Sequence, residues 1–289
     1  MEAQGALPSW PHECSERLWR KWRMKQPEKS ELTRRGMLTG LAAVGVGTAA
    51  VPGLAADRPM ISAGRVTGCD NAGVAVSRLS GRIAASADFA GAGRCDLSRD
   101  TVEGPYFICT DTMNARNIAE GVIGTPMTLS LRVTDQACEP IPGAIVDVWQ
   151  CDARGNYSGH TADPDSPNPA RQRGRRREPD APTRFLRGVL AADAEGIVEF
   201  DTIYPGFYGE RAVHTHYKVH VGNTAHLTSQ ALYPEEWNDR IFNDPLYSEG
   251  RGARRVPNAD DSFGRSGGLF AVRERGGRLL ATLNLSIPT

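Results

Sequence analysis

The stretch Pro205–Val221, PGFYGERAVHTHYKVHV, decides the fold and organises the rest of the chain. A Pro-Gly turn carrying Tyr208 leads into a strand with His214 and His216 at alternate positions. Side chains two residues apart on a strand point to the same face. Both imidazoles therefore share one face, while mostly apolar residues share the other. The pattern predicts a half-buried strand whose histidines converge on one metal ion; the alternative is a strand whose outer face is merely polar.

A second stretch, residues 144–160, reads AIVDVWQCDARGNYSGH. It predicts a hydrophobic strand, a turn from Asp152 to Asn156, and then Tyr157. A tyrosine phenolate has a free pKa of about 10, so it binds at neutral pH only to a strongly charged cation such as Fe(III). Magnesium and calcium favour carboxylates and carbonyls, and zinc favours cysteine, histidine and carboxylate ligands.

Together the two stretches resemble the intradiol ring-cleavage dioxygenases, the family of the protocatechuate 3,4-dioxygenase and catechol 1,2-dioxygenase type. Four motifs carry the resemblance, in the family's order: VDVWQ at 146–150, GNY at 155–157, TIYPGFY at 202–208 and RAVHTH at 211–216. It covers roughly residues 95 to 250. A further segment, TVEGPY at 101–106, resembles the one that precedes the catalytic sandwich of this family.

The resemblance implies a non-haem Fe(III) ion bound by Tyr157, Tyr208, His214 and His216. It implies a small aromatic diol and O2 as substrates. Tyr208 is the ligand expected to leave the iron when the diol binds. The ring then opens between its two hydroxylated carbons, giving a muconate-type diacid.

Two further residues are assigned roles by the resemblance. Arg211 matches the family arginine that stabilises anionic character near the iron, with a surface salt bridge as the alternative. Gln230 lies where the family often has a pocket glutamine. The chain departs from well-known members at Glu210, at Thr215 and in an insert that holds the basic run 171–177, so the substrate's identity stays open. The basic run is interpreted as a solvated loop, or as a lid that attracts anionic substrates.

Four more residues near these motifs have expected positions. Tyr204 and Trp149 are expected to be packing residues rather than catalytic ones. Asp147 and Gln150 are candidates to support a ligand. They point to opposite faces of a regular strand, so at most one of them faces the iron.

Short strands separated by turn residues predict an all-β fold, a β-sandwich with long loops. A short helical turn is expected at 235–244, and 250–268 is expected to be loop. The expected strands are 127–135, 143–150, 184–190, 196–203, the strand through His214 and His216, 225–232, and a closing hairpin of 269–273 and 278–286.

The N-terminal part reads as a targeting segment followed by a linker. Arg34 and Arg35 precede an Ala/Gly-rich hydrophobic run, so residues 1–56 are predicted to be a twin-arginine signal. Gly residues and Pro52 make that run a poor membrane span. Residues 57–94 are interpreted as a linker or poorly ordered arm, and 95–289 as the catalytic domain. The protein is therefore expected to be exported, periplasmic or extracellular.

Composition sets further limits. The 289-residue chain has a formal net charge of +0, which argues against a nucleic-acid partner. It leaves homo-oligomer formation open. Similar exported members of the family carry a cysteine pair where Cys138 and Cys151 flank a strand. The resemblance therefore favours a Cys138–Cys151 disulfide, with Cys95–Cys109 as a second pair and buried thiols as the alternative.

The sequence thus favours an exported Fe(III) intradiol dioxygenase acting on a catechol-type aromatic. One alternative is a non-catalytic, metal-containing β-sandwich that serves as a binding module of the cell envelope. Another is a metalloenzyme with a different metal and reaction. Arg211 together with four intact ligand positions favours catalysis.

Overall fold

The computed structural model describes residues 81–90, 92, 95–109, 116–161, 177–222, 224–249 and 256–288. The predicted signal segment, most of the predicted linker and residues 171–176 of the basic run lie outside these ranges. In chain order the elements are η1 (Ser86–Phe89), β1 (Pro126–Thr134), β2 (Ile145–Trp149), β3 (Arg187–Ala191), β4 (Ile197–Ile203), β5 (His214–Val221), β6 (Thr224–Leu232), α2 (Glu235–Ile241), α3 (Pro245–Ser248), η2 (Asn258–Asp260), β7 (Gly268–Leu269), β8 (Ala271–Arg275) and β9 (Arg278–Ser286).

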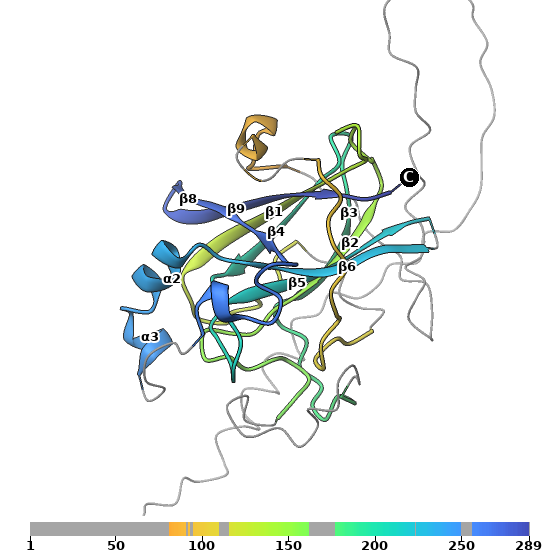
Figure 1. Cartoon of the computed structure of the whole chain (residues 1–289). Coiled ribbons are helices and arrows are strands. Elements are labelled where there is room, and N and C mark those ends of the chain that lie inside the picture. The colour runs from red at the N-terminus through yellow and green to blue at the C-terminus, as the bar shows by residue number, and fades with distance from the viewer. Residues whose placement is uncertain are drawn as a thin grey trace, which may run out of the picture. The chain divides into compact units, whose positions relative to one another are not determined.

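The strands form two sheets that share one core (Figure 1). One sheet has the order β4-β1-β9-β8 and the other the order β3-β2-β5-β6-β7. Most neighbours are antiparallel, but β1 pairs with β9, and β6 with β7, in parallel. The predicted β-sandwich is confirmed. The expected hairpin is β8–β9, and the expected helical turn is α2.

The core between the sheets fixes which way β5 faces. Its odd positions, including Tyr217 and Val219, are buried among the apolar side chains of β1, β2 and β4. Fully burying such a side chain contributes about 1.5–3 kcal/mol. Because side chains alternate along a strand, the even positions of β5 must then point to the outer face of the five-stranded sheet. This face carries His214 and His216.

Residues 98–109, which we call the cover segment, run beside β6 and then, from Glu103 onward, lie over the outer face of that sheet. The Thr101 backbone N–H donates to the Thr228 carbonyl, and the Thr228 N–H donates to the Asp100 carboxylate, both at 2.8 Å. Glu103 forms an ion pair with Lys218 of β5. Residues 101–106, the segment that resembles a family motif, therefore pack against the strand that carries the histidines.

Residues ahead of the cover segment also pack on the domain. Phe89 is 2% exposed and contacts Ile197 and Leu280. The buried Glu199 carboxylate accepts the backbone N–H groups of Ile83 and Ala84 at 2.7 and 2.5 Å. The packed domain therefore includes part of the range 57–94 that the sequence predicted to be linker.

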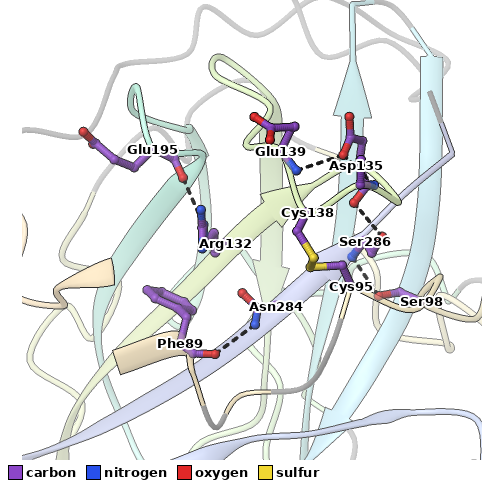
Figure 2. The surroundings of a disulfide bond; sticks show 11 residues. Phe89, Cys95, Ser98, Arg132, Asp135, Cys138, Glu139, Glu195, Asn284 and Ser286 are labelled. Carbon is purple, nitrogen blue, oxygen red and sulfur yellow. Dashed lines mark hydrogen bonds between the residues drawn. A yellow bond between two sulfur atoms is a disulfide. The ribbon is translucent and has the colours of Figure 1, made fainter. Parts of the chain in front are cut away.

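The disulfide predictions were wrong. Cys95 bonds to Cys138, next to the hydrogen-bonded pair Ser98 and Ser286 (Figure 2). Cys109 is disulfide-bonded as well, so it cannot pair with Cys95. Cys151 keeps its thiol, which donates to the Gly206 carbonyl at 3.4 Å.

Geometry explains the error. Cys138 precedes β2 and Cys151 follows it, so the twelve residues that separate them include this extended five-residue strand. That strand is about 16 Å long at about 3.3 Å per residue. A disulfide requires the two Cα atoms to lie within about 7 Å. Cys95 leads into the cover segment, so the bond to Cys138 ties that segment to the turn after β1.

Within the described part of the chain, no helix is both long enough and apolar enough to cross a bilayer.

Mapping of peptides without reduction tests the disulfide. A Cys95–Cys138 peptide is expected, with Cys151 alkylated only after denaturation, because its thiol is buried. The Cys95→Ser/Cys138→Ser variant should lose about 2–4 kcal/mol in free energy of unfolding, since the bond closes a long loop. Recovery of a Cys138–Cys151 peptide would contradict the structure.

Candidate metal centre

Two imidazole nitrogens face each other on the outer side of β5. The Nε2 atoms of His214 and His216 lie 3.1 Å apart, and both side chains are buried. Nδ1 of His214 is 2.7 Å from the Ala212 carbonyl, which only accepts hydrogen bonds, so Nδ1 carries the proton. Nε2 of His214 therefore presents a lone pair. Trp149 stacks parallel to His216 with ring centroids 5.0 Å apart, which fixes that ring.

Two tyrosines complete the group. Tyr208, between β4 and β5, places its hydroxyl 3.3 Å from Nε2 of His214. The Tyr157 ring, in the loop after β2, meets the Tyr208 ring edge-on at 5.3 Å. The Tyr157 hydroxyl is buried and has no hydrogen-bond partner among the described residues. The structure thus brings together all four side chains that the resemblance named as ligands.

The two loops that hold the tyrosines are fastened to each other at Gly206. Its N–H donates to the Asp152 carbonyl at 2.9 Å, and its own carbonyl accepts from the Cys151 thiol. A Cβ at this position would lie 2.5 Å from the Ala153 carbonyl oxygen, so only glycine fits. The Asp152 side chain accepts two backbone N–H groups within its own loop, which confirms the turn predicted ahead of Tyr157.

The electrostatics of the group favour a strongly charged cation. Burial raises the pKa of Tyr157 well above its usual value, and the nearby Tyr208 raises it further. Burial raises the pKa of Tyr208 to about 12 and lowers the pKa values of His214 and His216. The imidazoles are therefore neutral and ready to bind metal, while the phenols need a highly charged ion to lose their protons. The site offers two phenols and two imidazoles, and one phenol oxygen, that of Tyr157, is buried without a hydrogen-bond partner among the described residues. This set of donors fits Fe(III).

The cover segment closes the site from above. Gly104 has φ +74°, and a Cβ there would lie 3.2 Å from Cε1 of His216, so the backbone presses on that ring. Tyr106 stacks on Tyr157 with centroids 4.5 Å apart and meets Tyr208 edge-on. The last residue of the basic run, Arg177, places its guanidinium 5.8 Å from the centre of the Tyr106 ring.

Sequence reasoning missed Arg187. Its side chain is 2% exposed, donates to the hydroxyl and carbonyl of Ser158, and lies 5.9 Å from the centre of the Tyr157 ring. Burial lowers the pKa of Arg187 to about 10, which leaves it charged at neutral pH. The sequence could have indicated this residue, because an arginine within an otherwise apolar strand is expected to be buried together with a polar partner.

Arg211 and Gln230, to which the resemblance assigns roles, both lie beside the donors. Gln230 is the direct cross-strand partner of His216, and its side-chain oxygen accepts from Arg211 at 2.6 Å. Arg211 also forms a two-point ion pair with Asp261, with distances of 2.9 and 3.3 Å. Asp261 was missed, because it stands in a loop rich in acidic and basic residues where no pattern distinguishes it.

Gln150 and Thr215 point away from the donors. Gln150 bonds to Thr202, to the Ile203 carbonyl and to Thr215 on the inner side of the sheet. Thr215, where the chain differs from well-known members of the family, therefore lies on the inner side of the sheet. Its hydroxyl also forms a hydrogen bond with the Tyr233 hydroxyl. Glu210 is exposed.

The other two predicted residues lie on the outer face. Asp147 is the cross-strand partner of Lys218, beside the donors rather than against them. Trp149 is a packing residue as predicted, although it packs on His216 and Phe107 instead of in the core between the sheets. Tyr204 is in that core.

The chain is similar to known dioxygenases. The family described as "Dioxygenase" matches residues 102–257. The solved intradiol ring-cleavage dioxygenase from Tetranychus urticae is 33% identical, with a TM-score of 0.60, over 67% of this chain and 95% of that chain. Catechol 1,2-dioxygenase from Pseudomonas sp. (strain EST1001) is 27% identical over 60% of each sequence. Hydroxyquinol 1,2-dioxygenase from Rhodococcus opacus is 36% identical over 24% of this chain and 23% of that protein. The chain spans about 60% of the length of the Pseudomonas relative.

The buried carboxyl of Asp147 should make stability depend on pH. Burial raises its pKa to about 7, against the opposing charges of Lys218 and Arg187. The folded protein then holds this proton more tightly than the unfolded chain, so the contribution of Asp147 to stability should fall as pH rises from about 4 to 7. Metal-free protein and its Asp147→Asn variant are compared by denaturant unfolding across this range. As pH rises, the free energy of unfolding of the wild type should fall relative to that of Asp147→Asn. A difference between the two proteins that does not change with pH would contradict the raised pKa.

Proposed function

Because this chain belongs to the intradiol ring-cleavage dioxygenases, we propose that it binds non-haem Fe(III) and opens a catechol-type ring with O2. The product is a muconate-type diacid that contains both atoms of O2. The observation that carries the proposal is the convergence of Tyr208, His214 and His216 within 3.3 Å, beside the buried, unpartnered hydroxyl of Tyr157.

These four side chains would hold the iron. When bound, ferric iron supplies the charge that makes both phenols anionic and a coordinated catecholate reactive towards O2. The protein supplies the fixed positions. The His214 ring is held by the Ala212 carbonyl, His216 is clamped between Trp149 and Gly104, and Tyr157 is stacked under Tyr106.

Arg211 would stabilise negative charge that develops on the ring during cleavage. It is a mostly buried cation near Tyr208 and hydrogen-bonded to Gln230. A fixed positive charge in a site shielded from water stabilises a developing anion without reorganising solvent. Tyr208 is suited to accept a substrate proton if it leaves the iron, because its raised pKa favours the protonated phenol.

A small aromatic diol is the substrate class that the relatives support, since two of them are named for catechol and hydroxyquinol. The alternative, a metal-containing binding module without activity, has less support, because it gives no reason to bury a paired arginine beside the metal donors.

Export by the twin-arginine route is also part of the proposal. Arg34 and Arg35 before the Ala/Gly-rich run support it. Replacement of both by lysine should leave the protein in the cytoplasm of a host that has this pathway, and unchanged secretion would contradict the proposal.

Tyrosinate bound to ferric iron absorbs visible light, so the purified iron-loaded protein should be wine-red. It should consume O2 with catechol. Tyr157→Phe should bleach the colour and weaken iron retention at least tenfold, about the loss expected when a metal site is disturbed.

Tyr217→Phe is the matched control, because it removes the same hydroxyl from the inner face of β5. This variant should keep colour and iron. A colourless protein that takes up no iron would overturn the proposed function. A coloured, iron-loaded protein without O2 uptake on any catechol would favour the binding module.

A further inference from the structure

We propose that Asp261 is a positioning residue. It holds Arg211 in one orientation, and through Arg211 it turns the Gln230 amide so that its Nε2 group is the donor offered to bound substrate. The inference rests on the proposed function, and it adds a residue that lies beyond the range matched by the family, 102–257.

The contact between Asp261 and Arg211 has the geometry of a clamp. Nε of Arg211 donates to Oδ2 of Asp261 at 2.9 Å, and a terminal nitrogen donates to Oδ1 at 3.3 Å. The Asp261 side chain is 0% exposed and that of Arg211 is 17% exposed. A two-point contact between a planar guanidinium and a carboxylate fixes both the distance and the rotation of the arginine.

Asp261 is itself held rigidly. Its carboxylate accepts the backbone N–H of Ala212 and that of Phe263, both at 2.8 Å. The Phe263 ring lies 4.9 Å from the Arg211 guanidinium carbon and packs against it. Ala212 also accepts the His214 Nδ1 proton, so one short segment ties the arginine clamp to a metal donor.

The clamp determines how Gln230 is turned. The second contact of the terminal nitrogen of Arg211 is the Gln230 side chain, at 2.6 Å. Arginine has only donors, so the Gln230 atom facing it must be the oxygen. Nε2 must then point the other way; it is buried and has no hydrogen-bond partner among the described residues.

An unpartnered buried donor of this kind is unfavourable unless something accepts a hydrogen bond from it. Gln230 is the cross-strand neighbour of His216, so its amide lies beside the metal donors. An oxygen of a bound diol is the acceptor that this position would serve. The carboxylate of Asp261 therefore acts at a distance from the substrate, through Arg211 and Gln230.

The charges agree with this geometry. Burial tends to raise the pKa of Asp261, but Arg211 lowers it below its ordinary value. Burial tends to lower the pKa of Arg211, but Tyr208 and Asp261 raise it. Both groups are ionised at neutral pH, which a charged clamp requires.

Asp261→Asn tests the inference in the full-length, iron-loaded protein. The variant keeps the shape of the side chain but removes the charge and turns one acceptor into a donor that opposes Arg211. We expect kcat for catechol to fall by about 10-fold to 100-fold, as for loss of a hydrogen bond to a charged group. KM, iron content and the red colour should change little. Asp260→Asn, the same change at an exposed neighbour, is the matched control and should leave all four unchanged.

A second readout does not depend on activity. In metal-free protein, the Arg211 Nε–H should give a slowly exchanging side-chain NMR signal, assigned by its loss in Arg211→Lys. The signal should be present in the wild type and in Asp260→Asn, and should be lost or exchange rapidly in Asp261→Asn. A wild type without a protected signal would overturn the inference even if Asp261→Asn does not fold.

Gln230→Glu tests the final step, because it keeps an acceptor facing Arg211 and puts a carboxylate oxygen, with its negative charge, in place of the Nε2 donor. It should lower kcat by about the same factor as Asp261→Asn. Unchanged turnover in Gln230→Glu, or a loss in Asp261→Asn that merely follows lost iron, would overturn the inference. If the wild type consumes no O2, the proposed function fails, and the NMR comparison still decides whether Asp261 fixes Arg211.

Discussion

The Nε2 atoms of His214 and His216 lie 3.1 Å apart in a place from which water is excluded, with the Tyr208 hydroxyl 3.3 Å from the first. The Tyr208 hydroxyl can donate to Nε2 of His214, but the Tyr157 hydroxyl has no hydrogen-bond partner among the described residues. Such a group is costly in an empty site and favourable around a cation. The surrounding structure serves to hold these four donors together: β5 orients the histidines, Gly206 fastens the two tyrosine loops, and the cover segment closes the top.

Charge around the donors is balanced in pairs. Arg211 is neutralised by Asp261, and Lys218 forms an ion pair with Glu103 of the cover segment. Arg187 differs, since its hydrogen bonds go to the neutral Ser158 and the carboxyl that acts on it, Asp147, has a pKa raised to about 7 by burial. Its charge therefore remains available to offset the phenolate that Tyr157 would become on a ferric ion. This arrangement explains why a buried arginine stands within a strand where an apolar residue would otherwise be expected.

Much of the site could be predicted from sequence, because its pieces are local. The alternation of β5 places His214 and His216 on one face, and each tyrosine follows a short turn whose glycine is visible in the sequence. The strand positions agree with the predicted ranges for the same reason. Contacts between distant segments could not be predicted. Asp261 reaches Arg211 from 50 residues away, Cys95 and Cys138 are 43 residues apart, and neither contact leaves a periodic signal. The resemblance also suggested Cys138–Cys151, which the structure excludes, because Cys138 is bonded to Cys95 and Cys151 keeps its thiol.

The parallel pairing of β9 with β1 has a consequence for how the chain is made. Strand β9, which follows all the other described strands in the chain, lies between β1 and β8 in the interior of its sheet. While the ribosome is still adding residues, β1 has an exposed hydrogen-bonding edge where β9 will later sit. Such an edge invites pairing with other nascent chains. The edge of β1 is therefore protected only after β9 has been made. Chaperones that shield β1 during synthesis should increase the yield of this protein. Their effect should be smaller for a protein whose neighbouring strands follow one another in sequence.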